Sequence, residues 1–236
     1  MDIKKLINKS IEKFYLLRYR KSLPGSKNWL IMMEARYGGI ISQVPRNKTS
    51  SKDPRTREVL LTGGMSGGDR MSTFHHGYAD KYAEYLKPFL QRKEPVTLVE
   101  VGILSGIGLA IWSDLFVKGR ILGLDIDLGH MHKNMDNLKK KGAFRNMIPE
   151  LYEFDQFDDN QGFFTDILGG DKIDVFIDDG FHSTESILTT MKSAVPHLAK
   201  NFVYFIEDNS SVHEDLQTIY PHLTIDHRGE FTVLFP

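Results

Sequence analysis

Short hydrophobic runs recur along most of the chain, and helix-length segments separate them. The runs that predict buried strands are residues 96–101, 120–124, 149–154, 173–177 and 202–206. Between and before them, apolar side chains fall at helical spacing in residues 79–90, 109–116, 130–141, 163–168 and 186–198. This alternation is typical of a mostly parallel sheet with helices on both faces. Two final strands, 223–226 and 230–235, predict an antiparallel hairpin that completes a seven-stranded sheet.

The first part of the chain has a different pattern. Residues 3–20 place apolar side chains at helical spacing under a basic face, which predicts an N-terminal helix that packs on its own domain or on a second copy of the chain. Residues 42–58 are polar and predict a loop, and residues 62–70 are rich in glycine, as expected of a hinge or lid. We therefore divide the chain into a helical extension with a lid, residues 1–70, and a main domain, residues 71–236.

Composition removes several classes of function. The 30 Lys and Arg residues nearly balance the 31 Asp and Glu residues, so no net field favours nucleic acid as a partner. The chain has no cysteine, so a metal site must use oxygen or imidazole ligands. No run approaches the roughly 20 apolar residues that a membrane span needs, which predicts a cytoplasmic protein.

A glycine turn after the first predicted strand of the main domain indicates a nucleotide-binding unit. The strand ends at Glu100-Val101, and Gly102, Ser105 and Gly106 follow before the next helix. The next strand ends at Asp125, about 20 residues on, where an acid meets ribose hydroxyls in Rossmann-like folds. The glycine spacing does not fit the dinucleotide pattern, and the acid before the turn favours a cationic ligand. S-adenosylmethionine has the ribose and the positive charge that these positions predict.

Two acidic turns follow the next pair of inner strands. Asp178, Asp179 and His182 follow the first strand, and Glu207 and Asp208 follow the second. Parallel strands end at one edge of a sheet, so these side chains are expected to converge there. Crowded carboxylates repel one another, so we expect a divalent cation or a cationic ligand among them.

These residues resemble a known family. Val99-Glu100-Val101-Gly102 with Gly106, followed by Asp125-Ile126-Asp127, is similar to motif I and the next acidic motif of class I S-adenosylmethionine-dependent methyltransferases. The turns at 178–182 and 206–208 resemble those of the metal-dependent sugar O-methyltransferases of antibiotic biosynthesis, of the macrolide and mycinamicin type.

The resemblance implies a set of site residues. Asp179, Glu207 and Asp208 would hold a divalent metal, expected to be Mg²⁺, and His182 would act as general base beside Asp179. The residues that it places at the S-adenosylmethionine site are Tyr82, Glu100, Gly102, Ser105, Gly106, Asp125, Asp155, Gln156 and Asp178. The implied acceptor is a glycoside or sugar, with no nucleic acid as partner, and the N-terminal helix is expected to join copies of the chain.

Other interpretations stay open at this point. The acceptor could be a catechol-like diol or a surface glycan carrying a phosphoramidate, and the chain could be a catalytically silent binding subunit. His182 could simply begin a helix that Asp179 caps. Phe181 departs from the small polar residue common in the family's turn, so the acceptor pocket is expected to differ there.

Overall fold

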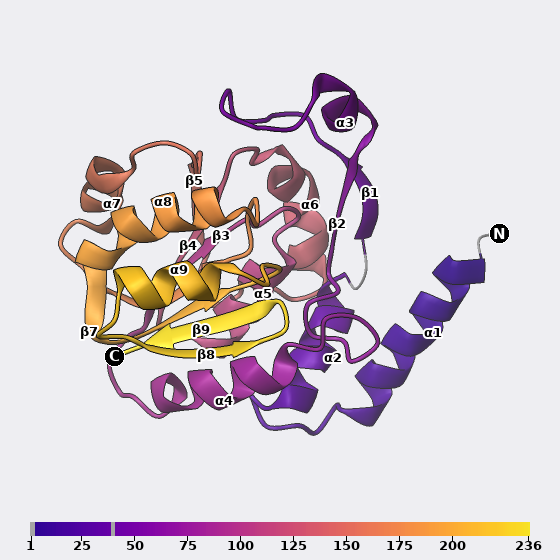
Figure 1. Cartoon of the computed structure of the whole chain (residues 1–236). Coiled ribbons are helices and arrows are strands. Elements are labelled where there is room, and N and C mark those ends of the chain that lie inside the picture. Colours follow the sequence, from indigo (N-terminus) through magenta and orange to yellow (C-terminus); the bar gives the residue numbers. More distant parts are fainter. Residues whose placement is uncertain (1–2, 39–40) are drawn as a thin grey trace.

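A twisted seven-stranded sheet forms the centre of the molecule (Figure 1). The computed structural model describes residues 3–38 and 41–236. The parallel strands are β3 (Thr97–Val101), β4 (Arg120–Asp125), β5 (Glu150–Glu153), β6 (Ile173–Asp178) and β7 (Leu198–Ile206). The antiparallel strands β9 (Phe231–Phe235) and β8 (Thr224–Arg228) complete the order β5-β4-β3-β6-β7-β9-β8. The predicted α/β, Rossmann-like fold with its C-terminal hairpin is confirmed.

The register of the strands brings their carboxyl ends to one edge. Val101 on β3 pairs with Leu124 on β4 and with Asp178 on β6, and Asp178 pairs with Ile206 on β7. The turns after β3, β4, β6 and β7 therefore begin at the same level of the sheet. This alignment places the glycine turn beside the two acidic turns.

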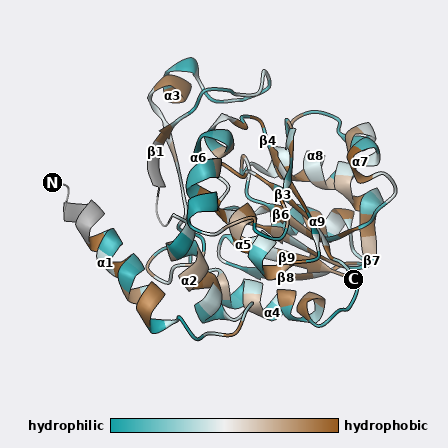
Figure 2. Ribbon diagram, turned by 180° about the vertical axis from the view of Figure 1, so that it is seen from behind, coloured by the Kyte–Doolittle hydropathy of each residue, from teal (hydrophilic) through white to brown (hydrophobic). Residues whose placement is uncertain are grey.

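Helices cover both faces of the sheet. One face packs against α2 (Lys27–Tyr37), α4 (Ala79–Leu90), α5 (Ile107–Leu115) and α6 (Gly129–Lys140), and the other against α7 (Gln161–Leu168), α8 (Thr184–Ala194) and α9 (Val212–Ile219). Each face has its own cluster of buried side chains, with Trp112 in the first and Phe164 in the second. Figure 2 shows the apolar strands inside and the hydrophilic outer surface of α6.

The helices of the main domain lie close to their predicted positions, with one omission. Residues 79–90 form α4 as predicted, and α8 ends at Ala194, before a short 3₁₀ turn, Val195–His197, that contains Pro196. Helix α9 was not predicted, because only Val212 and Leu216 along it are buried. Its start is stabilised by the Asn209 side chain, which accepts hydrogen bonds from the backbone N–H groups of Ser211 and Val212.

The N-terminal part is more ordered than the sequence indicates. Helix α1 (Ile3–Arg18) packs on α2, and α2 contributes buried side chains to the main core. The segment predicted as a loop, residues 42–58, overlaps β1 (Ile41–Pro45) at its start and the beginning of α3 (Arg57–Thr62) at its end. The glycine-rich segment contains β2 (Gly64–Gly67), which pairs with β1. Antiparallel pairing satisfies backbone groups of both strands, and a role of the glycine-rich segment as a hinge or lid stays a prediction.

Helix α1 extends away from the sheet (Figure 1). Its exposed apolar side chains include Ile7, Phe14 and Leu17. Association of two copies through this helix stays a prediction. Within the described ranges, no helix has both the length and the apolar character needed to cross a membrane.

Candidate active site

A cavity of about 420 Å³ opens at the carboxyl edge of the parallel strands. Its wall combines the turns after β3, β4, β5, β6 and β7 with residues 46–55 and with the glycine-rich segment around β2. This volume lies within the range of small-molecule sites. The predicted site residues that line it are Glu100, Gly102, Ser105, Asp125, Asp155, Gln156, Asp179, His182, Glu207 and Asp208.

The glycine turn after β3 packs directly on the first acidic turn. Gly102 has a φ of 84°, and a Cβ atom there would lie 1.8 Å from the backbone carbonyl oxygen of Asp179. A side chain is therefore excluded by both conformation and space. The Asp125 carboxylate accepts hydrogen bonds from the backbone N–H groups of Leu104, at 2.9 Å, and Asp127, at 3.0 Å. Asp125 thus fixes the turn, and burial raises its pKa.

Three predicted residues converge at the other side of the cavity. Single ligand atoms of Asp179, His182 and Asp208 all lie within 4.8 Å of one another. Their side chains are 25%, 33% and 29% exposed, so a small ion or a substrate can reach them. His182 has a φ of 66° and Asp208 a φ of 55°, in the left-handed region that non-glycine residues rarely adopt. Such strained conformations cluster at functional sites.

The His182 ring is held by a backbone carbonyl. Its Nδ1 atom lies 3.3 Å from the carbonyl oxygen of Glu207, which can only accept, so Nδ1 carries the proton in a neutral ring. The Nε2 atom then has a free lone pair and lies 3.9 Å from Oδ1 of Asp179. The alternative in which Asp179 caps the following helix is not observed, because the Ser183 side chain caps α8 through the backbone N–H of Ser186 at 3.1 Å.

Arg70 occupies the centre of the acidic edge and was not predicted. Its guanidinium donates to Glu100 at 2.7 Å and to Glu207 at 3.1 Å, and it also pairs with Asp179. The side chains of Glu100 and Glu207 are 1% and 2% exposed, so both pairs lie out of solvent. Burial raises the pKa of both glutamates, and the Arg70 charge opposes that rise. The chain thus supplies part of the positive charge that the sequence assigned to a ligand.

Glu207 lies outside the group of possible metal ligands among the described residues. Its carboxylate accepts hydrogen bonds from Tyr82 and Arg70, and it does not belong to the described groups that could hold an ion. The geometry therefore favours Asp179, Asp208 and His182 around any ion and leaves Glu207 as a buried partner of Arg70. Its role as a metal ligand stays a prediction.

Three predicted cofactor contacts do not belong to the described residues that line the cavity: Tyr82, Gly106 and Asp178. Asp178 is fully buried and accepts from Gln156 Nε2 at 2.8 Å, and burial raises its pKa to about 6. The Gln156 side chain also accepts from the backbone N–H of Phe181 at 2.7 Å. Asp178 and Gln156 therefore brace the first acidic turn. Direct contact of the three residues with a cofactor stays a prediction.

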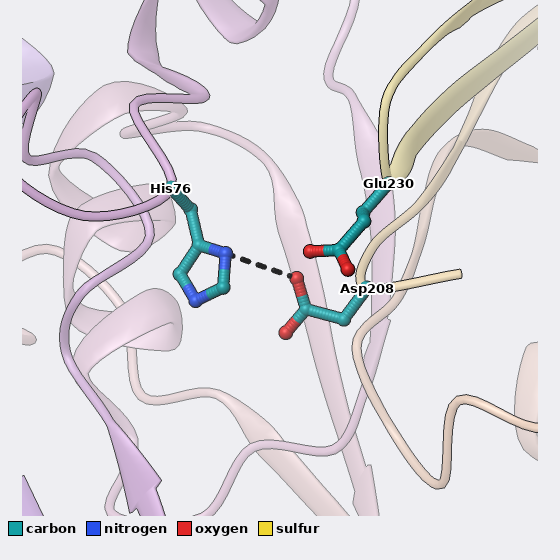
Figure 3. A group of neighbouring side chains, drawn as sticks. All are labelled: His76, Asp208 and Glu230. Atoms are coloured by element: carbon teal, nitrogen blue, oxygen red, sulfur yellow. Dashed lines mark ion pairs between the residues drawn. The ribbon is translucent and has the colours of Figure 1, made fainter. Parts of the chain in front are cut away.

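A second group of possible ligands adjoins the first. His76 points at Asp208, with 3.3 Å between Nδ1 and Oδ1, and Glu230 lies beside them (Figure 3). The Tyr78 hydroxyl also donates to Asp208 at 2.7 Å. Neither Arg70 nor His76 follows a strand of the sheet, so the rule that located the acidic turns could not find them.

Comparison with known proteins supports the resemblance. No protein-family model matches the sequence. The chain is 28% identical over 174 residues to 8-demethyl-8-alpha-L-rhamnosyl tetracenomycin-C 2'-O-methyltransferase of Streptomyces olivaceus, covering 70% of this chain and 40% of that protein. It is 27% identical over 145 residues to mycinamicin VI 2''-O-methyltransferase of Micromonospora griseorubida, covering 57% and 32%. The chain thus spans less than half the length of these curated relatives.

A solved structure shares the fold. The MycE methyltransferase from the mycinamycin biosynthetic pathway, in complex with Mg, SAH and mycinamycin VI, matches 70% of this chain and 50% of its own with a TM-score of 0.54 and 18% identity. At that identity the match concerns the fold. Together with the curated relatives, it confirms the resemblance predicted from the glycine turn and the acidic turns: the chain is similar to class I S-adenosylmethionine-dependent methyltransferases and, among them, to the sugar O-methyltransferases of antibiotic biosynthesis.

Proposed function

We propose that the protein is an S-adenosylmethionine-dependent, divalent-metal-dependent O-methyltransferase that acts on a hydroxyl of a sugar or of a sugar-containing small molecule. One observation carries the proposal. His182 and Asp208, both held at positive φ, meet Asp179 at the cavity that the glycine turn also lines. The curated relatives, which are both named as O-methyltransferases and one of which is named for a rhamnosyl compound, support the same reaction class.

The glycine-turn side of the cavity fits the methyl donor. The backbone approach at Gly102, the Ser105 side chain and the Asp125 carboxylate offer a close surface and polar partners for a ribose and an amino acid. Among the described residues that the turns after β3, β4 and β5 contribute to the cavity wall, Glu100, Asp125 and Asp155 are acidic and none is Lys or Arg, which suits a sulfonium better than a phosphate. When bound, S-adenosylmethionine supplies the methyl group and leaves as S-adenosylhomocysteine.

The acidic side fits a hard divalent cation. Asp179 and Asp208 offer carboxylate oxygens that are reachable from the cavity, and the third member of the group, His182, keeps its Nε2 lone pair for the proton of the acceptor. Mg²⁺ prefers oxygen ligands and keeps several waters, which suits a site with few protein ligands. When bound, the ion would orient the acceptor hydroxyl and lower its pKa.

His182 is the base in this proposal. With its proton on Nδ1, the Nε2 lone pair can accept the proton of an acceptor hydroxyl that lies beside Asp179. The oxygen then bonds to the transferred methyl group. The Glu207 carbonyl fixes the ring, and Asp179 stabilises the imidazolium that forms.

Binding and transfer can be tested separately. We expect the full chain to bind S-adenosylhomocysteine in calorimetry, and to methylate members of a glycoside panel with Mg²⁺ but not with EDTA. His182→Ala and Asp179→Asn should reduce transfer by at least about 100-fold while cofactor binding stays within a few-fold. The matched controls His132→Ala and Asp166→Asn change exposed residues elsewhere and should behave as the wild type.

Two outcomes would change the proposal. If the chain binds the cofactor and methyl transfer continues in EDTA, the metal is not part of the mechanism. This outcome is worth testing because Asp179 already pairs with Arg70. Cofactor binding with no transfer to any glycoside, diol or phosphoramidate acceptor would leave a silent binding subunit. Unchanged transfer in both variants would show that the assigned base and ligand are wrong.

A further inference from the structure

Residues 46–55, which we name the cap segment, cross over the cofactor side of the cavity. Asn47 donates to Asp127 at 3.0 Å, Lys48 pairs with Glu153 at 2.5 Å, and Lys52 donates to the backbone carbonyl of Phe157 at 2.9 Å. These contacts attach the segment to the turns after β4 and β5. The segment therefore forms a wall of the cavity rather than a free loop.

The cap segment presents two arginines to the cavity. Arg55 lies with its guanidinium carbon 4.3 Å from the centre of the Phe181 ring, and it pairs with Asp53 through two of its nitrogens. The Asp53 side chain is almost completely buried, so this carboxylate is fully engaged by Arg55. Phe181, whose position departs from the family pattern, is thus the platform on which Arg55 is stacked.

Arg46 has no ion pair of its own among the residues that the structure describes. It lines the same cavity, and a Cβ atom at Gly63 would lie 3.3 Å from its Nη1 atom, so the guanidinium extends along the glycine-rich segment. Asp53 acts on it only at longer range. Partial burial lowers the pKa of Arg46, and the neighbouring charge of Arg55 lowers it further, so the two cations lie close together.

We infer that Arg46, held beside Arg55 on the cap segment, binds an anionic group of the acceptor, a carboxylate or a phosphate, while the acceptor hydroxyl lies at Asp179 and His182. Arg55 engages the Asp53 carboxylate, and no described carboxylate pairs with Arg46, whose guanidinium group lines the cavity. A planar guanidinium binds a carboxylate or a phosphate through two parallel hydrogen bonds. This inference rests on the proposed function, because the hydroxyl position is taken from it.

The charge distribution of the cavity supports an acceptor with two different ends. Asp179, Glu207 and Asp208 gather at the strand edge, and Arg46 and Arg55 lie on the cap segment. A neutral macrolide sugar would leave the Arg46 charge partly desolvated without compensation. An acidic sugar or a sugar phosphate would compensate it.

The inference predicts a preference that can be measured without the natural acceptor. We would titrate the full chain with D-glucose, D-glucuronate and D-glucose 6-phosphate by NMR, with and without S-adenosylhomocysteine and Mg²⁺. At least one anion should bind more tightly than glucose by about tenfold to a hundredfold. Arg46→Gln should remove this preference, and Arg46→Lys should keep part of it. The relative affinities of the two anions distinguish a carboxylate from a phosphate.

The control and the contrary outcomes separate this inference from the proposed function. Arg57→Gln removes an exposed positive charge just after the cap segment, outside the described cavity wall, and should keep the preference. The inference would be overturned if the wild type bound neither anion more tightly than glucose. The inference would also be overturned if Arg46→Gln weakened S-adenosylhomocysteine binding by as much as it weakened anion binding, because Arg46 would then bind the cofactor. If the wild type binds no S-adenosylhomocysteine, the proposed function fails, while the titration without it still decides the anion preference.

Discussion

Replacing Arg70 by methionine tests how the acidic edge is stabilised. Methionine keeps an unbranched apolar stem, is shorter than arginine, and removes the charge and all donors. In the wild type the guanidinium contacts Glu100, Glu207 and Asp179 and is itself only 10% exposed. After the change, Glu100 retains a hydrogen bond from Trp112 and Glu207 retains one from Tyr82.

The expected cost follows from the burial of the two glutamates. Removing one partner of a buried ion pair costs about 3–5 kcal/mol, because the remaining charge stays desolvated. Asp179 is partly exposed and adds little, since solvent screens it. For a chain of 236 residues this loss lowers the unfolding midpoint by roughly 6–20 °C.

Urea unfolding at pH 7.5 in EDTA measures the loss. Lys27→Met is the matched control, because Lys27 pairs with Asp80 at 2.5 Å on the surface and its removal should cost no more than about 1 kcal/mol. Arg70→Lys should fall between the two, because an ammonium keeps the charge and cannot span three carboxylates. A loss below about 1 kcal/mol in Arg70→Met, or one equal to that of the control, would refute the assignment of Arg70 as the internal counter-charge.

Three further changes test separate contacts. Gly102→Ala should cost more than about 3 kcal/mol and abolish S-adenosylhomocysteine binding, because its Cβ atom would meet a backbone carbonyl. The control Gly169→Ala, at a φ of 59° in open space, should cost only about 1 kcal/mol. Equal losses of unfolding free energy in urea would contradict the close approach at Gly102. Tyr82→Phe removes a donor to buried Glu207 and should cost about 1–3 kcal/mol in the same assay; a neutral change would mean that this hydroxyl contributes nothing. Burial lowers the pKa of His227 below 6.5, so the unfolded state binds the proton first and stability falls as the pH drops below about 6.5. His227→Gln should reduce the difference between the urea unfolding midpoints at pH 7.5 and pH 5.5. An unchanged difference would exclude His227 as the cause of the pH dependence.

The sequence predicted the parts of the site that depend on single strands. A buried strand must end where its apolar run ends, so Asp125, Asp179 and Asp208 could be assigned to one edge from local pattern alone. The glycine at position 102 could be recognised for the same reason, because the turn follows its strand directly. These positions needed no knowledge of how distant segments pack.

The remaining features depend on contacts between segments far apart in the chain. Arg70 and Glu207 are separated by 137 residues, and nothing in the polar run around Arg70 indicates that it is buried. The pairing of β1 with β2 was missed for a related reason, since both strands are short, β1 ends in a proline, and glycine and serine make up most of β2. The hydrogen bonds of Glu207 with Tyr82 and Arg70 could not be inferred from its place in an acidic turn.

Arg70 changes what the acidic edge requires of a ligand. When Glu100, Glu207 and Asp179 are all ionised, one guanidinium faces three carboxylates and two negative charges remain, with Asp208 beside them. A fully uncompensated cluster would demand a cation for folding, whereas this cluster can fold first and bind a cation afterwards. The buried glutamates are held by Arg70 and the chain's own donors, and the more exposed Asp179 and Asp208 stay accessible. The acidic edge thus has two parts. Glu100 and Glu207 are buried and stabilised by the fold. The strained residues His182 and Asp208 belong to the accessible part, where the proposed reaction would take place.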